Sequence, residues 1–485
     1  MLKQSLFIPL LRQDSSKTLP VYQKLFQYLK ESILDGRITP GTKLPSSRQL
    51  SQQMGIARNS VLSVYEMLNA EGLTFTKAGS GTYTADLRIH LSTANVDNVS
   101  NAAPHKLSDF ANKINSSLVE AGNENTRFDS LLKPGQPALS HFPRKDWLRS
   151  IQASVMQANS LEGQPVFGCR VLREQIAIHL NETRGVISSA DQIMITSGSQ
   201  QALSILLHLL VNSGDKVYLE DTGYQGVDGL LHAVGAKGIA VDTDEQGICL
   251  PDHVEHSVSP QLLIVTPSRS FPLGQTLSIT RRLAILEWAS KHNGIIIEDD
   301  YDSEFIFNGL PIAALQGLDQ SNRVVYTGTF SRTLFPGIRL GYLVMPKQLI
   351  PLMTQYRRLI DGGLSVVSQF ALASFMQQGF YNSHLRRMRK LYQERKAVLD
   401  QGVLQNFPAW KLVPSRGGMH SVFILPSSLD DQSICKRAMK CNVELRPLSI
   451  YSRNQHKKTQ GLVMGYAGYT ASEIKTAITR LKEII

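Results

Sequence analysis

Hydrophobic residues recur with helical spacing near the start of the chain. One run extends from Val21 to Leu34 and stops before Gly36, and this spacing is typical of a helix with one apolar face. The pattern therefore predicts a first amphipathic helix. Its inward positions are expected to be Val21, Leu25, Phe26, Leu29 and Ile33.

Two shorter helices and a hairpin are predicted next. Ser46-Ser47 offers an N-cap for a helix that continues to about Met54, and Gly55 then breaks the chain. A third helix is predicted over residues 58–70, and residues 72–84 are typical of a small hairpin. The inward side chains of the third helix are expected to be Val61, Tyr65 and Leu68.

Beyond residue 127, short apolar runs alternate with helical patterns. Strands that alternate with helices predict a mainly parallel sheet with helices on both faces. Ligand sites in such sheets lie at the carboxyl ends of the strands. The predicted strands are residues 192–196, 216–219, 262–265, 295–297 and 324–326, with a helix over 200–210.

The segment between the two patterns has the composition of a tether. Residues 86–126 are rich in Asn, Ser and Ala and contain few large apolar side chains. A weak helical pattern at Phe110, Ile114 and Leu118 leaves open whether the tether is partly ordered. We therefore expect a first domain over residues 15–85, a linker over 86–126 and a second domain over 127–485.

Length and composition agree with two domains. The 485 residues exceed the roughly 250–300 residues that a single core sustains. The sequence contains neither a run of about 18 apolar residues nor a recognisable signal peptide, so we expect a cytoplasmic protein. The four cysteines are widely scattered, which argues against a disulfide framework and against a metal site.

Positive charge is concentrated near the N-terminus. Residues 1–85 contain 10 Lys and Arg against 5 Asp and Glu, whereas the remaining 400 residues share the rest of the net charge of +11. A basic N-terminal domain is typical of a module that binds nucleic acid. A basic run at Arg386, Arg387, Arg389 and Lys390 is instead expected to be a solvated helix face.

The start of the third predicted helix carries side chains that suit DNA recognition. Arg58, Asn59 and Ser60 open this helix after the turn at Gly55, and two short helices in this arrangement fit the major groove. A plain three-helix bundle with solvated arginines is the alternative.

The spacing Gly-Arg-x-x-x-Gly-x-x-Leu-Pro-Ser-x-Arg from Gly36 to Arg48, with the glycine-rich stretch that follows, resembles the GntR-type winged helix-turn-helix. The resemblance implies that double-stranded operator DNA is a partner. It further implies contacts to phosphates and base edges from Arg48, Arg58, Asn59 and Ser60, and a wing at Lys77 to Gly81, with Gly79 at its turn, that touches the minor groove.

Three strand ends of the second domain carry groups that suit a phosphorylated ring. The stretch from Ser197 to Gln200 opens a helix, so its N–H groups can bind a phosphate. The acidic stretch from Glu298 to Asp302 can bond a protonated ring nitrogen, and the segment 328–342 offers hydroxyls and a cation. Each of these three segments alone is also typical of an ordinary turn. Their occurrence in this order along the chain favours a single ligand site to which all three contribute.

Together with Glu220 to Tyr224 and Gly168 to Arg173, these segments resemble fold-type-I aminotransferases, and in particular the MocR group, in which a GntR head is joined to such a domain. The resemblance implies an α/β fold with a large, mainly parallel sheet and a smaller C-terminal α+β subdomain. It implies pyridoxal 5'-phosphate as cofactor, with Asp299 at the pyridine nitrogen, Tyr301 at the ring hydroxyl, Tyr224 stacked on the ring, and Ser199, Thr329, Ser331 and Arg339 at the phosphate.

The chain departs from this family at the chemical centre. Arg332 stands where the family has its Schiff-base lysine, and a guanidinium stays protonated and cannot form an imine. The family's Thr-Pro-Ser-His-Gln run has Arg269 and Ser270 at its last two positions, and its Pro-Gly-Tyr-Pro run ends here in Gln225. No residue is therefore expected to be catalytic, and any cofactor is expected to bind without a covalent bond.

We expect a homodimeric transcriptional regulator whose second domain senses a small effector. One hypothesis is that this domain binds pyridoxal or pyridoxamine phosphate, or a related vitamin B6 or amino compound, non-covalently. A second is that it dimerises the chain or binds another ligand without the cofactor. A third, which Arg332 disfavours, is an active aminotransferase that carries a DNA-binding head.

Overall fold

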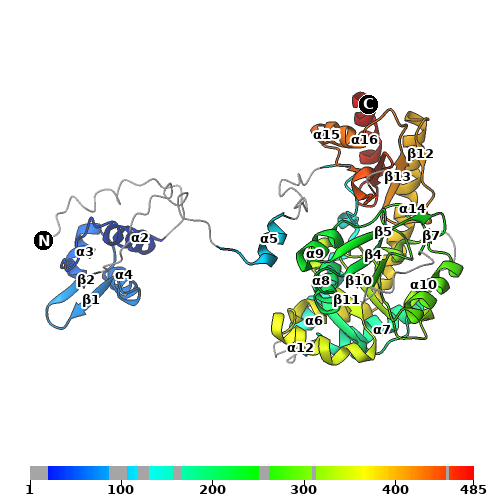
Figure 1. Ribbon diagram of the computed structural model, residues 1–485. Helices are drawn as coiled ribbons and strands as arrows, with labels where there is room; N and C mark the ends of the chain where they lie inside the picture. Colours follow the sequence, from blue (N-terminus) through cyan, green and yellow to red (C-terminus); the bar gives the residue numbers. More distant parts are fainter. Residues whose placement is uncertain are drawn as a thin grey trace. The chain divides into compact units, whose positions relative to one another are not determined.

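The computed structural model describes residues 20–86, 106–116, 130–156, 165–250, 262–307, 313–454 and 458–485. The chain divides into two compact units, residues 1–106 and 107–485. Figure 1 shows the elements of each unit, which we describe separately.

The first unit is a three-helix bundle with a two-stranded sheet. The helices enclose a small apolar core in which Leu25, Leu50 and Val61 are fully buried. The two strands pair antiparallel, with Phe75 opposite Tyr83. The elements are α2 (Val21–Leu34), α3 (Ser47–Met54), α4 (Arg58–Ala70), β1 (Thr74–Lys77) and β2 (Gly81–Thr84).

Local signals explain where these helices begin and end. Ser46 caps α3 with two hydrogen bonds. Its hydroxyl accepts from the backbone N–H of Gln49, and its own backbone N–H donates to the side-chain oxygen of Gln49. Gly55 ends α3 with φ 65°, a left-handed conformation that glycine adopts readily. The predicted helices and hairpin are confirmed. The expectation that Val21 faces inward is wrong: this first residue of α2 is 57% exposed, since it precedes the turns that pack on α4.

The second unit is built on a seven-stranded sheet. The strand order is β3-β11-β10-β9-β8-β4-β5. All neighbouring strands pair parallel except at β11, which runs antiparallel to β3 and β10. The strands are β3 (Ile193–Thr196), β4 (Lys216–Glu220), β5 (Lys237–Val241), β8 (Leu262–Val265), β9 (Ile295–Asp300), β10 (Val324–Thr329) and β11 (Gly341–Val344).

Helices cover both faces of this sheet, as the continuous apolar runs predict. Met194 packs on one face with α8 and α9, whereas its neighbours Ile193 and Ile195 pack on the other face with α7 and α13. A short hairpin, β6 (Thr243–Asp244) and β7 (Gly247–Ile248), lies beyond β5. The helices are α6 (Arg144–Met156), α7 (Arg170–Arg184), α8 (Ser199–Leu210), α9 (Gly226–Val234), α10 (Ile279–Lys291), α11 (Leu315–Leu318), α12 (Ile350–Ile360), α13 (Val366–Gln377) and α14 (Phe380–Asn406).

A smaller α+β part completes the second unit, as the sequence predicts. Its four strands are antiparallel in the order β12-β13-β15-β14, and the long helix α14 packs against its last helix. The elements are β12 (Lys411–Leu412), β13 (His420–Ile424), β14 (Arg446–Pro447), β15 (Gly461–Gly465), α15 (Asp431–Lys440) and α16 (Ala471–Ile484).

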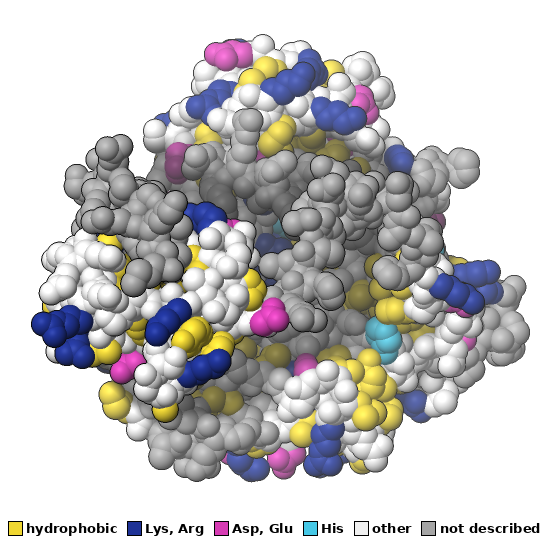
Figure 2. All heavy atoms as spheres, turned by 90° about the vertical axis from the view of Figure 1, so that its left-hand side faces the viewer, with side chains coloured by type: hydrophobic (Ala, Val, Ile, Leu, Met, Phe, Trp, Pro, Cys, Tyr) yellow, Lys and Arg dark blue, Asp and Glu magenta, His cyan; other side chains and the backbone are white. Residues whose placement is uncertain are grey.

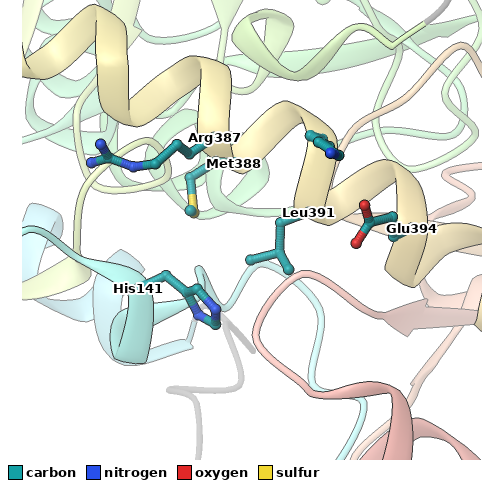
Figure 3. A pocket seen from close by; sticks show the side chains of 6 residues that line it. His141, Arg387, Met388, Leu391 and Glu394 are labelled. Atoms are coloured by element: carbon teal, nitrogen blue, oxygen red, sulfur yellow. The ribbon is translucent and has the colours of Figure 1, made fainter.

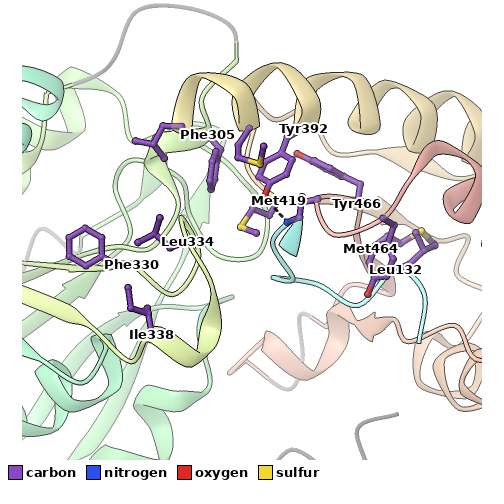
Figure 4. Close-up of a cluster of buried hydrophobic side chains, with 14 of the residues drawn as sticks. Leu132, Phe305, Phe330, Leu334, Ile338, Tyr392, Met419, Met464 and Tyr466 are labelled. Carbon is purple, nitrogen blue, oxygen red and sulfur yellow. Dashed lines mark hydrogen bonds between the residues drawn. The ribbon is translucent and has the colours of Figure 1, made fainter. Parts of the chain in front are cut away.

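One apolar cluster joins the large sheet to this smaller part. Figure 4 shows Phe305, Tyr392 and Tyr466 within it, all buried. The Tyr392 hydroxyl accepts a hydrogen bond from the backbone N–H of Ala138 at 3.0 Å, so the N-terminal segment of the unit is tied to α14. Each such large side chain contributes about 1.5–3 kcal/mol by its burial.

The weak helical pattern in the predicted linker corresponds to α5 (Asp109–Ser116), which packs on α9. The Phe110 ring lies 5.9 Å from that of His208, and the Ser116 hydroxyl lies 3.1 Å from His232 Nε2. Part of the linker therefore belongs to the second unit. Leu118 lies outside the described residues.

Candidate functional site

The first turn of α4 presents the predicted DNA-reading side chains to solvent. Arg58 and Asn59 are exposed and Ser60 is half-buried. The Arg58 Nε donates to the Ser47 hydroxyl at 3.3 Å, which orients this arginine beside the start of α3. Arg48 is exposed on the first turn of α3. The N-termini of both helices thus carry cations at a polar surface.

The hairpin carries the predicted wing residues at its tip. Lys77 ends β1, and its ammonium lies 5.6 Å from the Phe75 ring and 5.3 Å from the Tyr83 ring. Gly79 forms the turn with φ 73°. Both positions are exposed, as contact with a nucleic acid requires. Figure 2 shows Lys and Arg side chains exposed at the surface, beside hydrophobic and other side chains.

In the second unit, the strand register brings most of the predicted ligand residues together at the carboxyl ends of the parallel strands. Thr329, the last residue of β10, lies opposite Gly341 of β11, which in turn lies opposite Thr196, the last residue of β3. One strand further along, Asp299 of β9 lies opposite Thr327. Carboxyl ends of parallel strands therefore meet here, where open α/β sheets bind ligands.

Two of the polar groups predicted to hold a phosphate, Ser199 and Arg339, lie at the start of α8. Ser199 is the first residue of α8, and Gly198 before it has φ 116°. The Arg339 guanidinium lies beside Gly198, since an added Cβ there would be 3.7 Å from its Nη2. The Ser331 hydroxyl is buried and has no partner among the described residues. A helix N-terminus, a cation and a free hydroxyl suit a phosphate.

Asp299 places a buried carboxyl group on the adjacent strand. It accepts a hydrogen bond from the Thr327 hydroxyl at 3.0 Å. Burial raises its pKa to about 6, partly offset by that hydrogen bond. A carboxylate desolvated in this way is well suited to pair with a protonated ring nitrogen.

Tyr301 is held by an arginine that the sequence did not single out as a ligand-site residue. The Arg269 Nη1 donates to the Tyr301 hydroxyl at 2.7 Å and to Asp302 at 2.9 Å. Burial raises the pKa of Tyr301 well above its ordinary value, although the nearby Arg269 charge lowers it. The Tyr301 hydroxyl therefore keeps its proton and can donate it to a ligand oxygen.

Tyr224 lies at the open side of the site and is 40% exposed. Its hydroxyl donates to the Gln200 side chain at 3.1 Å. The loop that carries it is fastened from the smaller part of the unit, because Arg453 donates to both carboxylate oxygens of Asp228 at 2.8 Å and to the Tyr224 carbonyl at 3.0 Å. An aromatic ring is thus held over the site.

Arg332 follows β10 and reaches the N-terminal segment of the unit. Its Nη1 donates to the carbonyl oxygen of Gly135, and a Cβ at position 135 would overlap the guanidinium. The Arg332 charge lowers the pKa of both Tyr224 and Tyr451, whose net pKa values burial nevertheless raises. The guanidinium charge therefore acts on both tyrosines.

The arrangement can bind a phosphorylated aromatic ring but offers no amine to react with it. The orphaned Ser331 hydroxyl, Arg339 and the start of α8 fit a phosphate, and Asp299 fits a ring nitrogen. The imine-forming position holds a guanidinium. Pyridoxal phosphate therefore fits as a non-covalent ligand and does not fit as a covalently held cofactor.

Several residues that shape the site escaped sequence reasoning. Arg453 bonds to Tyr224, which lies 229 positions away along the chain, and Thr327 bonds to Asp299, 28 positions away. No local pattern marks such contacts. Arg269 did carry a signal, since it departs from the family's run, but its role as the partner of Tyr301 did not follow from that.

Two hollows lie among the described residues. Only the smaller one is lined by any of the predicted ligand residues. A polar cavity of about 20 Å³ beneath the site is lined by residues that include Asp300, Tyr301 and Thr329, and this is room for about one water. A surface hollow of about 310 Å³ lies along α14 between His141, Arg387 and Glu394 (Figure 3).

The basic run on α14 is only partly a solvated face. Arg386, Arg387 and Lys390 are exposed or half-exposed. The expectation is wrong for Arg389, whose guanidinium pairs with Glu304 at 2.9 Å. Glu304 also bonds His179 at 2.5 Å, so Arg389 completes a half-buried network.

Comparison with known families assigns both units. The family described as "Bacterial regulatory proteins, gntR family" matches residues 21–84, and "Aminotransferase class I and II" matches residues 132–481. None of the helices in the described ranges combines the length and apolar character that a membrane crossing needs.

Two relatives match nearly the whole chain. The chain is 34% identical to the probable rhizopine catabolism regulatory protein MocR of Rhizobium meliloti, over 97% of this chain and 94% of the relative. It is 29% identical to the pyridoxine biosynthesis transcriptional regulator PdxR of Corynebacterium glutamicum, over 95% of each chain.

Solved structures resemble the second unit. Pyrococcus horikoshii kynurenine aminotransferase aligns with a TM-score of 0.67 and 25% identity, covering 80% of this chain and 95% of that one. The LysN aminotransferase of Thermus thermophilus aligns with a TM-score of 0.69 at 23% identity, covering 78% and 96%, and shows the shared fold.

Proposed function

Because the chain belongs to the MocR-type group of GntR-family transcriptional regulators, we propose that it binds operator DNA in response to pyridoxal 5'-phosphate held non-covalently. DNA binding itself follows from the GntR unit. The ligand and its mode of binding are the proposal. The name of the PdxR relative supports a link to vitamin B6.

One observation carries the choice of ligand. The buried Ser331 hydroxyl has no partner among the described residues, and it follows the strand end that lies in register with the start of α8. A buried hydroxyl without a partner costs about 1–3 kcal/mol. A phosphate at the start of α8 would remove that cost, and Arg339 would neutralise its charge.

The remaining groups would orient the ring. Asp299 would accept a hydrogen bond from the pyridine nitrogen, Tyr301 would donate to the ring oxygen, and Tyr224 would cover the ring face. Bound pyridoxal phosphate supplies an aldehyde and an electron-withdrawing ring. Arg332 brings no amine to that aldehyde and no base for proton transfer, so we propose binding without turnover.

We further propose that the chain acts as a homodimer. Large apolar side chains are exposed on two helices of the second unit, among them Met156 at 84% on α6 and Leu359 at 83% on α12. Apolar side chains that gather into an exposed patch mark a protein interface, and we propose that these two helices belong to the dimer contact. A chain that sediments as a monomer at micromolar concentration would overturn this part.

The test is a titration of the full chain with pyridoxal 5'-phosphate, following absorbance and melting temperature together. We expect the native chain to be stabilised without an aldimine band. The Arg332→Lys variant should acquire the band. Arg386→Lys, which places a lysine on an exposed helix face instead, controls for adventitious imines and should show none.

Each other outcome speaks against a defined part of the proposal. No stabilisation of the native chain would mean that the second unit serves another ligand or dimerisation alone. An aldimine band in the native chain would overturn the non-covalent mode. Measured transamination would restore the enzyme hypothesis.

A further inference from the structure

The Arg332 guanidinium is incompletely satisfied. A guanidinium carries five N–H donors, and among the described residues Arg332 uses one of them, toward the carbonyl oxygen of Gly135. It makes no ion pair within the described ranges, unlike Arg269 with Asp302 and Arg453 with Asp228. The charge and most of its donors therefore remain available.

The groups around Arg332 do not form an ion pair with it within the described ranges. The Arg332 charge acts on Tyr224 and Tyr451, but burial raises the pKa of both hydroxyls, to about 12 for Tyr451, so both are neutral. His420 is kept neutral because burial lowers its pKa well below the usual value. The carboxylate acting on this region, Asp302, is already bonded to Arg269.

Position 332 also determines which part of a ligand meets this charge. It stands where the family's lysine joins the carbon attached to ring position 4, so the side chain at this position is the one that meets the 4-substituent. A cation held there attracts hydrogen-bond acceptors and repels a second cation. The effect is strongest in a partly dehydrated site.

We propose that Arg332 makes the site select phosphorylated pyridines whose 4-substituent is a neutral or anionic hydrogen-bond acceptor and reject those that carry an ammonium group there. An aldehyde, an alcohol or a carboxylate meets this requirement, whereas a 4-aminomethyl group does not. This inference rests on the proposed function. It predicts, from the replacement of the lysine by Arg332, which chemical class of effector the site accepts.

Two ligands of matched shape test the rule. Pyridoxine 5'-phosphate and pyridoxamine 5'-phosphate differ at position 4 only by a hydroxyl against an ammonium, and neither can form an imine with the protein. Isothermal titration of the full native chain at pH 7.5 should show the alcohol bound at least about tenfold more tightly, which corresponds to about 1.4 kcal/mol.

Two variants assign the effect to the Arg332 charge. Arg332→Gln keeps a polar side chain without the charge and should remove the preference. Arg332→Lys keeps the charge and should retain it. The melting temperature of each ligand-free variant shows that the chain is folded.

The outcomes separate this inference from the proposed function. Equal affinities in the native chain, or a preference that survives in Arg332→Gln, would overturn the inference while leaving the site assignment intact. Failure of both ligands and of pyridoxal 5'-phosphate to bind the native chain would instead overturn the proposed function.

Discussion

Replacement of Asp299 by asparagine should stabilise the ligand-free chain at neutral pH. Burial raises the pKa of Asp299 from 3.8 to about 6, and such a rise costs the ionised folded state about 3 kcal/mol. The asparagine side chain would keep the size of the native one and a bond to the Thr327 hydroxyl, which now lies 3.0 Å from the carboxylate. The variant would lose only the charge.

The expected gain depends on pH in a defined direction. The pKa of Asp299 is higher in the folded chain than in the unfolded chain. Ionisation of Asp299 therefore lowers the stability of the native chain as pH rises from about 4 through about 6. The variant has no such loss. Its advantage should therefore grow from about zero at pH 4 to about 3 kcal/mol at pH 8. The buried Glu298, whose pKa owes nothing to Asp299, titrates in the same way in both chains and cancels in the difference.

Urea unfolding followed by tryptophan fluorescence measures this difference. All three tryptophans of the chain, Trp147, Trp288 and Trp410, lie in the second unit, so the signal reports on that unit alone. Protein concentration must be held fixed, since association shifts apparent stability.

Asp302→Asn is the matched control. Burial raises the pKa of Asp302 to about 6 as well, but Asp302 pairs with Arg269 at 2.9 Å. Its loss leaves a buried guanidinium without a counter-charge and should destabilise the chain by about 3–5 kcal/mol. A gain for Asp299→Asn that does not change with pH, or no gain at pH 8, would refute the reasoning.

Three further predictions concern other parts of the chain. Arg58→Ala should relax specificity at one operator position, whereas equal losses on all sequences in a binding assay would make Arg58 a phosphate contact. Arg453→Gln should weaken pyridoxal phosphate binding about tenfold, because it frees the Tyr224 loop from Asp228; an unchanged titration would show that this clamp does not position the ring. His232→Ala should speed amide exchange in α5 about fivefold through loss of the Ser116 contact, and unchanged exchange would show that the contact adds nothing to docking.

Elements set by local chemistry were predictable from the sequence. The cap at Ser46 and the left-handed Gly55 act within one helical turn, so they mark the limits of α3 directly. The strands of the large sheet are buried on both faces, and continuous apolar runs such as residues 262–265 are therefore visible in the sequence. The resemblance to a known family then implied the large, mainly parallel sheet and the smaller α+β part, whereas the order of the strands came from the structure.

Contacts between distant segments were not predictable in the same way. Arg332 meets Gly135 across 197 positions, and Arg453 meets Asp228 across 225. The sequence indicated that Arg332 cannot serve as the lysine, but not where its guanidinium would go. Arg389 shows the opposite error, since a basic run on a helix suggested solvent exposure while Glu304 from a distant loop pairs with it.

The energetic character of the retained groups favours binding over a purely structural role. A scaffold selected only for stability gains nothing from the buried Asp299 carboxylate, which costs about 3 kcal/mol at neutral pH, or from a buried Ser331 hydroxyl without a partner among the described residues. Both costs would fall if a phosphorylated pyridine bound as proposed. Arg332 removes the reacting amine but keeps a cation at the same position in the chain. The site could therefore bind a ligand without reacting with it. On this proposal, the free energy released when the ligand relieves Asp299 and Ser331 is what can shift the chain between two states.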